Sequence, residues 1–130
     1  MLRKLFYYWL PLFFWMGMIF FGSSQTKASI SPSVQVNFVF FKSLHLLEYA
    51  ILYFLWFRAL YSFHPHKKKL KLCLSIAFLI TIFYSSTDEF HQLYIPTRNG
   101  SLRDIFIDSL GMLIMYFGIQ RFFPLIKKIL

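Results

Sequence analysis

Four long apolar segments constrain this chain more than any other feature. They cover about residues 5–22, 38–63, 70–94 and 102–123, and polar turns separate them. A bilayer core needs about 20 helical residues to cross it. The third segment is apolar only to about Thr87, so its helix is expected to continue to about Tyr94. With 58% hydrophobic residues, the chain is too apolar for a soluble domain. We predict an all-α membrane protein, one domain over residues 1–130 that forms a four-transmembrane-helix up-down bundle.

The first apolar segment has a second interpretation, as a secretory signal peptide. Its apolar run over residues 5–21 is long for that role, and Lys27 disfavours the candidate cleavage site after Ala28. We therefore favour a retained transmembrane helix, which Pro11 is expected to kink.

The basic residues are divided unequally between the two sides of the predicted bundle. A formal net charge of +9 would suggest nucleic acid in a soluble protein, but here the basic residues flank apolar segments and no nucleic-acid motif is present. The side with more Lys and Arg is cytoplasmic by the positive-inside rule, and both termini lie on it. That side holds Arg3, Lys4, Arg58, Lys67, Lys68, Lys69, Lys71, Arg121, Lys127 and Lys128, whereas the other holds Lys27, Lys42, Arg98 and Arg103.

All five acidic residues fall on the predicted outer side. Glu48 lies in the second helix, Asp88 and Glu89 end the third, and Asp104 and Asp108 begin the fourth. An unpaired carboxylate at membrane depth costs at least about 2.5–3.5 kcal/mol, so these groups should face inward and pair. Helical spacing places polar residues on three stripes, one for each of these helices. The stripes are Lys42, His45, Glu48 and Tyr49; Asp88, His91 and Gln92; and Asp104, Asp108 and Gly111.

A catalytic site is one interpretation of these stripes. His91 or His45 could act as general acid or base, with Asp88 or Glu48 orienting the imidazole. Asp104 is the fifth residue that we assign to catalysis. This hypothesis requires the catalytic residues and Arg98 to converge on a cleft that lipid can reach.

The same cluster offers groups for a phosphate-bearing substrate. The forked donors of Arg98 and Arg103 match phosphate oxygens, and Lys42 would assist them. Gln92 and Asp108 are assigned to the same substrate pocket. The expected ligand is a phospholipid or a lipid-linked wall precursor. A divalent cation held by Asp104, Asp108 and neighbouring acids is a variant of this site.

The alternative is an ion-pair network without catalysis. Arg98 and Arg103 would then neutralise Asp104, Asp108 and Asp88 and hold the outer ends of three helices together. In that case the protein binds a lipid, a wall precursor or a protein partner, and no cleft is left. The residues alone do not favour one interpretation over the other.

The polar segments resemble the VanZ-like family. The resemblance covers all four helices in order, so the chain as a whole resembles one VanZ-like domain. Thr97 departs from the pattern, because glycine is common there, and Asp108 stands where Asn or Asp occurs. The matching segments are Phe21-Gly22-Ser23-Ser24-Gln25, Lys42-x-x-His45-x-x-x-Tyr49, Asp88-Glu89-x-His91-Gln92, Pro96-x-Arg98, Arg103-Asp104 and Asp108-x-x-Gly111.

This resemblance implies a protein of the bacterial cytoplasmic membrane. Founding members of the family are associated with resistance to glycopeptide antibiotics of the teicoplanin type. Fold-level analogy relates such proteins to membrane enzymes that exchange lipid headgroups, such as phosphatidylserine synthases. The resemblance thus favours an outer-leaflet enzyme that acts on a phosphate-bearing lipid.

Overall fold

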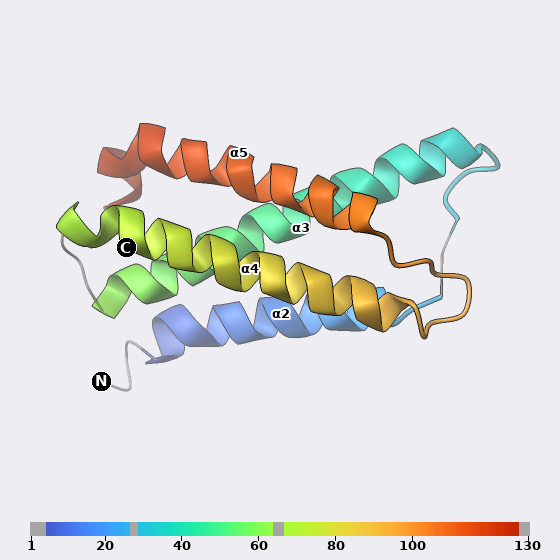
Figure 1. The fold of residues 1–130 in the computed structure, drawn as a ribbon, viewed down its shortest axis with the longest axis horizontal. Helices are drawn as coiled ribbons and strands as arrows, with labels where there is room; N and C mark the ends of the chain where they lie inside the picture. The colour runs from blue at the N-terminus through green and yellow to red at the C-terminus, as the bar shows by residue number, and fades with distance from the viewer. Residues whose placement is uncertain (1–4, 27–28, 64–66, 128–130) are drawn as a thin grey trace.

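The computed structural model describes residues 5–26, 29–63 and 67–127, and the described part contains helices and turns without a strand. A π-helix, η1 (Leu5–Trp9), leads into α2 (Leu10–Ser23). Then follow α3 (Val34–Phe63), the short 3-10 helix η2 (Lys67–Lys69), α4 (Leu70–Gln92) and α5 (Leu102–Ile126). Four helical spans, the first running continuously over Leu5–Ser23, are long and apolar enough to cross a membrane. The described residues therefore confirm the predicted all-helical fold with four helices that suit a membrane (Figure 1).

The two prolines within apolar segments act differently from one another. Pro11 stands at the start of α2, directly after the π-helical turn of η1. Pro124 lies inside the last helix, so the predicted end near residue 123 was wrong: the helix continues to Ile126 across non-helical dihedral angles at Phe122 (φ −107°, ψ 17°). Proline removes one backbone hydrogen bond and crowds the preceding turn. In a membrane helix the result is a kink rather than a break.

The other helix bounds lie close to those predicted. The second helix begins at Val34 rather than near residue 38, and the third ends at Gln92 rather than at Tyr94. The side chain of Asn37 explains the earlier start of α3. Its Oδ1 accepts hydrogen bonds from the N–H groups of Ile30 (2.9 Å) and Ser31 (3.0 Å), which fixes the chain that enters the helix.

The core lies along α3, which crosses the other helices obliquely and packs against α4 and α5 (Figure 1). Tyr49, Tyr53, Phe57 and Tyr61 follow one another at four-residue steps and are almost fully buried. This spacing keeps their side chains on one face of the helix. The outer surface is rich in exposed Phe, Leu and Ile, which suits contact with lipid.

The first helix is an integral part of this packing. Leu12 is fully buried, and the indole N–H of Trp15 donates a hydrogen bond to the Glu48 carbonyl at 3.0 Å. The Tyr84 hydroxyl donates to the Met16 carbonyl at 2.7 Å. These contacts join α2 to α3 and α4, as expected of a retained helix of the bundle.

Gly111 brings α5 against α3 just below the polar cluster. A Cβ atom at Gly111 would overlap the backbone carbonyl of Leu46. Small residues at such crossings allow membrane helices to approach closely. This contact sets the depth at which the polar side chains of α3 and α5 meet.

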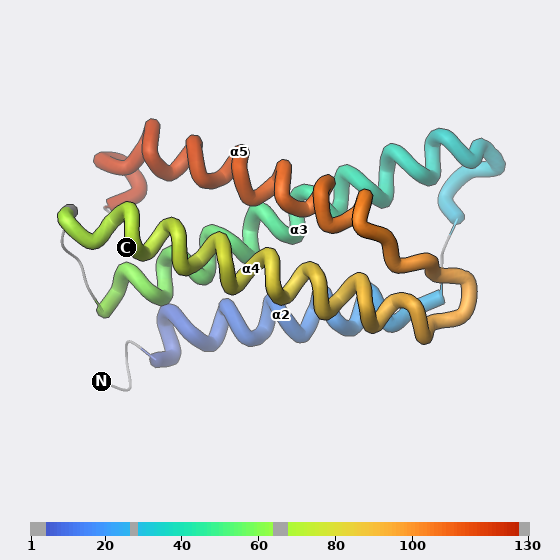
Figure 2. Tube along the Cα trace, viewed as in Figure 1, coloured from blue at the N-terminus to red at the C-terminus, as the bar shows by residue number. Residues whose placement is uncertain are grey.

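The helix ends sort into two groups. Figure 2 shows the end of α2, the start of α3, the end of α4 and the start of α5 toward one end of the molecule. Near the opposite end, the Arg58 guanidinium lies 4.3 Å from the ring centroid of Tyr7. Of the basic residues used to predict orientation, Arg3, Lys4, Lys27 and Lys128 lie outside the described residues.

Candidate functional site

The polar cluster lies at the end of the molecule where α4 joins α5. Four of the five acidic residues are buried there: Asp88 and Glu89 on α4, and Asp104 and Asp108 on α5. The facing residues on α3 include Lys42 and His45. Burial of so many carboxylates among apolar helices is costly unless each finds a partner, so their contacts define what the site can do.

Asp104 is the acid with cationic partners. Its Oδ2 forms an ion pair with the Lys42 ammonium at 2.5 Å, and its Oδ1 lies 3.6 Å from the Arg103 Nε. The side chain of Arg103 is 68% exposed, so this second contact is weak. Ser101 caps α5, and its hydroxyl accepts from the Asp104 N–H at 3.3 Å.

Asp108 is the most deeply buried acid, with a side chain only 1% exposed. Its Oδ2 accepts a hydrogen bond from the Ser85 hydroxyl at 2.6 Å. Its Oδ1 has no hydrogen-bond donor among the described residues and lies 3.9 Å from the Nδ1 of His45. The contact with His45 is too long for a hydrogen bond.

Glu89 belongs to the cluster, although the spacing argument did not select it. Its Oε2 accepts from the backbone N–H of Ser101 at 2.9 Å, and the Gln92 amide lies 3.4 Å from its Oε1. Gly100 permits this fold-back, because a Cβ there would overlap the Glu89 carbonyl. The signal was present in the sequence, since Ser85, Glu89 and Gln92 share a helix face.

Asp88 was expected on the same stripe as His91 and Gln92, and only part of that stripe faces the cluster. The Gln92 amide donates to Asp88 Oδ2 at 3.1 Å. His91 instead faces α2: its Nε2 lies 3.1 Å from the Ser24 hydroxyl, and its ring centroid lies 4.8 Å from that of Phe20. His91 lines neither of the two cavities described next.

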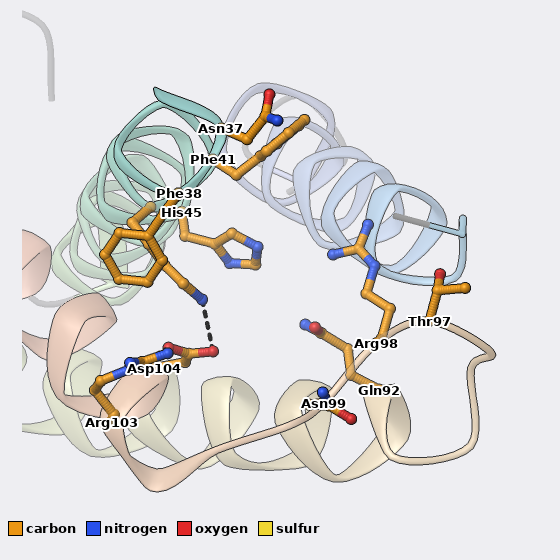
Figure 3. Close-up of a pocket in the computed structure, with 11 residues that line it drawn as sticks. Asn37, Phe38, Phe41, His45, Gln92, Thr97, Arg98, Asn99, Arg103 and Asp104 are labelled. Atoms are coloured by element: carbon orange, nitrogen blue, oxygen red, sulfur yellow. Dashed lines mark ion pairs between the residues drawn. The ribbon is translucent and has the colours of Figure 1, made fainter. Parts of the chain in front are cut away.

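A cavity of about 170 Å³ opens above the acids. Its lining includes four nitrogen bases, Lys42, His45, Arg98 and Arg103, and one acid, Asp104. Figure 3 shows Arg98 and Gln92 on one side of this cavity and His45 with Asp104 on the other. We call it the basic cavity. The remaining lining residues are Asn37, Phe38, Phe41, Thr97 and Asn99.

A second cavity, of about 160 Å³, lies between α2 and α3 and shares Phe41, His45 and Arg98 with the basic cavity. Glu48 lines it, together with apolar residues such as Ile19 and Leu44. The shared residues make His45 the imidazole common to both spaces.

Arg98 has a role that the sequence did not indicate. Its guanidinium donates to the carbonyl groups of Gly22 and Gln25, both at 2.9 Å. These carbonyls lie at the C-terminal end of α2, where backbone acceptors lack helical partners. Arg98 therefore ties the loop after α4 to the end of α2 while it lines both cavities.

The residues that match the family pattern thus meet in space. The Ser23-Ser24-Gln25 segment supplies contacts for His91 and Arg98, and Gly111 supplies the helix crossing beneath the acids. The sequence profile of the VanZ/LLP1 family matches residues 8–124. The chain belongs to the VanZ/LLP1 family. No curated protein and no solved structure matches it.

The residues that match the VanZ/LLP1 profile include every candidate site residue. The structure places these candidates in four groups. Lys42, His45, Gln92, Arg98, Arg103 and Asp104 line the basic cavity; Asp88 and Asp108 are buried beside them; Glu48 lines the second cavity; and His91 lies outside both.

Proposed function

We propose that this VanZ/LLP1 protein binds a phosphate-bearing lipid in the basic cavity and catalyses transfer or hydrolysis of its phosphoester. The observation that carries the proposal is the gathering of Lys42, His45, Arg98 and Arg103 around one space. Ammonium and guanidinium groups hold phosphate oxygens through charge-assisted hydrogen bonds. The adjoining apolar cavity suits the part of a lipid that continues into the membrane.

The proposed setting is the bacterial cytoplasmic membrane, with four spans in an up-down arrangement and both termini in the cytoplasm. The excess of Lys and Arg on the side of the termini supports this orientation. The basic cavity would then open to the outer leaflet. A lipid-linked wall precursor is a substrate of the right chemistry there, which would connect the protein to resistance of the teicoplanin type.

His45, rather than His91, is the proposed acid–base group. It lines both cavities, whereas His91 contacts Ser24 and Phe20. In the proposed step a hydroxyl oxygen attacks phosphorus, its proton passes to the His45 imidazole, and the bond to the leaving alcohol breaks. The imidazolium then returns the proton to the leaving oxygen.

Binding of the phosphate can be tested with purified, delipidated protein and phosphatidylglycerol, detected by native mass spectrometry. Diacylglycerol, which lacks the phosphate, is the matched ligand. Arg103→Ala should weaken phosphatidylglycerol binding by about 10-fold or more, because a hydrogen bond to a charged group contributes about 1.5–3 kcal/mol. Arg121→Ala, at the opposite end of the same helix, should leave binding unchanged. Equal binding of both lipids would overturn the proposal.

Catalysis needs its own readout, since binding alone also fits a non-catalytic protein. Phosphatidylglycerol in proteoliposomes should lose or exchange its headgroup, as measured by phosphorus NMR, and His45→Gln should abolish the reaction. His91→Gln should retain it. Phosphate-dependent binding without any turnover in the presence of water and glycerol would leave the protein as a lipid-binding module and would contradict the enzyme.

A non-catalytic clamp is the second candidate, and two contacts favour it. Arg98 is bonded to the end of α2, and Lys42 is paired with Asp104. Both are interactions that hold helices together. Under this proposal the cluster joins the helix ends, and the protein binds a lipid, wall precursor or protein partner through another surface.

A further inference from the structure

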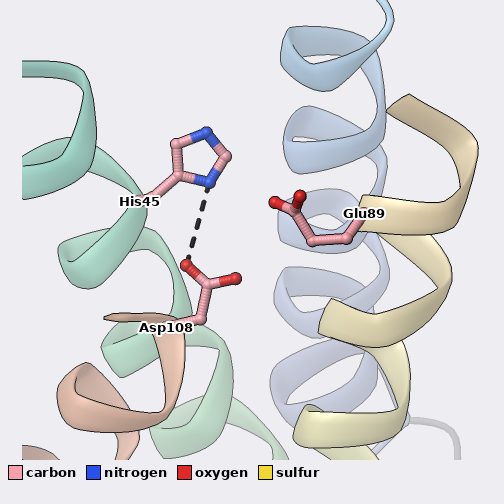
Figure 4. A group of neighbouring side chains, drawn as sticks. All are labelled: His45, Glu89 and Asp108. Carbon is pink, nitrogen blue, oxygen red and sulfur yellow. Dashed lines mark ion pairs between the residues drawn. The ribbon is translucent and has the colours of Figure 1, made fainter. Parts of the chain in front are cut away.

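Three potential metal ligands from three helices converge beneath the basic cavity. His45 on α3, Glu89 on α4 and Asp108 on α5 each offer a ligand atom, and these atoms all lie within 4.8 Å of one another (Figure 4). Two ligands of one cation lie about 3–4 Å apart when each metal bond is about 2.0–2.2 Å. Small side-chain rotations would therefore bring all three ligand atoms within bonding distance of one ion.

In each of the two carboxylates, one oxygen accepts a short hydrogen bond, and the other oxygen is available to bind a cation. The Ser85 hydroxyl donates to Asp108 Oδ2, and the Ser101 N–H donates to Glu89 Oε2. Among the described residues, the hydrogen bond to Glu89 Oε1 is the long one of 3.4 Å from Gln92. Carboxylates that bind metals are oriented in this way by hydrogen bonds from surrounding groups.

The atoms that face one another are buried and lack hydrogen bonds. Asp108 Oδ1 and His45 Nδ1 have no hydrogen-bond partner among the described residues, and the Asp108 side chain is only 1% exposed. A buried acceptor without a donor is costly. An unpartnered oxygen aimed at an unpartnered imidazole nitrogen and a nearby carboxylate indicates a missing positive charge between them.

Basic side chains do not supply that charge in the described part of the chain. Lys42 and Arg103 pair with Asp104, and Arg98 donates to the carbonyl groups of α2. Glu89 has no ion pair there, and Asp108 has only the long contact with His45. A bound cation or a shared proton is needed to balance the two carboxylates.

We propose that His45, Glu89 and Asp108 form a binding site for a divalent transition-metal cation. One imidazole nitrogen and two carboxylate oxygens suit Mn²⁺, Fe²⁺ or Zn²⁺ better than Mg²⁺ or Ca²⁺, which take oxygen ligands. Three protein ligands leave further positions on the ion for water or a phosphate oxygen. Asp104, which the sequence suggested as a ligand, is instead paired with Lys42.

The site rests on its own ligand geometry and does not depend on the lipid proposal. If both hold, the cation would activate the attacking oxygen, and His45 would act as a ligand rather than as the base. Metal binding is therefore measured without any lipid substrate, so that failure of one proposal leaves the other distinguishable.

The test uses the full chain, purified in detergent and stripped of metal with a chelator. Mn²⁺ is titrated in and free Mn²⁺ is measured by electron paramagnetic resonance, with Zn²⁺ as competitor. The expected result is one Mn²⁺ per chain, displaced by Zn²⁺, and a melting temperature that rises by several degrees on binding. Asp108→Asn and Glu89→Gln should each weaken binding by more than about 10-fold, as should His45→Gln.

Glu48→Gln is the matched control, because Glu48 lies one turn from His45 but outside the trio. It should bind Mn²⁺ as the parent does. Circular dichroism and size-exclusion chromatography establish that each variant is folded. Ser85→Ala gives a milder test, since it frees Asp108 without removing a ligand, and should weaken binding by less than Asp108→Asn.

Two results would overturn the site. One is a parent protein that binds no stoichiometric Mn²⁺ or Zn²⁺, which would leave a shared proton as the balancing charge. The other is a folded Asp108→Asn variant that binds Mn²⁺ with the affinity of the parent, which would place the ion elsewhere.

Discussion

The carboxylate of Glu89, in the last turn of α4, accepts a hydrogen bond of 2.9 Å from the backbone N–H of Ser101, the residue that caps α5. In a capping box the acid that satisfies this N–H comes from the third position of the same helix. That position is Asp104, but its carboxylate is paired with Lys42 instead. A neighbouring helix therefore completes the cap, and the start of α5 is fastened to the end of α4.

The cap at Ser101 predicts that truncating this side chain lowers the stability of the protein. Ser101→Ala removes the hydroxyl that accepts from the Asp104 N–H and should lower the free energy of unfolding by about 1 kcal/mol. Thermal unfolding in detergent measures the change. Ser86→Ala is the control: its exposed hydroxyl donates to the Ile82 carbonyl within α4, so the effect should stay within about 0.5 kcal/mol. Equal losses at the two serines would argue against the cap.

The close crossing of α3 and α5 predicts that substituting two glycines of α5 by alanine changes the stability in opposite directions. Gly111→Ala places a methyl group against the Leu46 carbonyl and should lower the free energy of unfolding by about 1–3 kcal/mol. Gly118→Ala meets no atom within 4 Å and should be neutral or stabilise the helix by up to about 1 kcal/mol. Melting temperatures of the two variants measure the contrast, and a tolerated Gly111→Ala would mean that the helices are farther apart.

Thr97 predicts a gain in stability on substitution. Its φ of 70° lies in the left-handed region, which a β-branched residue rarely adopts and glycine adopts without strain. Thr97→Gly should therefore raise the free energy of unfolding by about 1 kcal/mol. Thr87→Gly, at an exposed position inside α4, should lower it by roughly 0.5 kcal/mol, because glycine is a poor helix former. If both substitutions shifted the free energy of unfolding in the same direction, the left-handed backbone at Thr97 would be contradicted.

The two arginines of the basic cavity should separate in their effects on stability. Arg98→Ala removes two hydrogen bonds to the end of α2 and should cost about 1–3 kcal/mol of unfolding free energy. Arg103→Ala should change it by less than about 0.5 kcal/mol, since that side chain is 68% exposed and forms one weak pair. Thermal unfolding without added lipid measures both. An Arg98→Ala variant as stable as the parent would argue against the proposal that the polar cluster is a non-catalytic clamp.

The membrane class and the helix bounds could be predicted because they depend on local properties of the sequence. Apolar length and turn residues fix where a helix crosses a bilayer and where it ends. An observed helix bound differs from the predicted one where a side chain bonds to backbone outside the helix, as Asn37 does ahead of α3. The last helix was predicted to end too early, because a helix within a membrane tolerates a proline, here Pro124, that would break an exposed helix.

The site was predicted less completely, because it depends on how the helices are rotated about their axes. Spacing places Asp88, His91 and Gln92 on one broad face, and that face is shared between α2 and the cluster. No local pattern indicates which neighbour each side chain meets. Glu89 was expected to face inward, but it was not placed on a stripe, because the N–H group that it binds lies 12 residues away, beyond the turn.

The 30 residues of α3 have a consequence for experiments in lipid. At 1.5 Å per residue the helix is about 45 Å long, against a hydrocarbon core of about 30 Å. The excess must be taken up by tilt or by helix that emerges into the interface. Acyl-chain length therefore changes the immersion depth of Lys42 and His45, and with it the local dielectric around them. Ligand affinities for this protein should be compared only between bilayers of matched thickness.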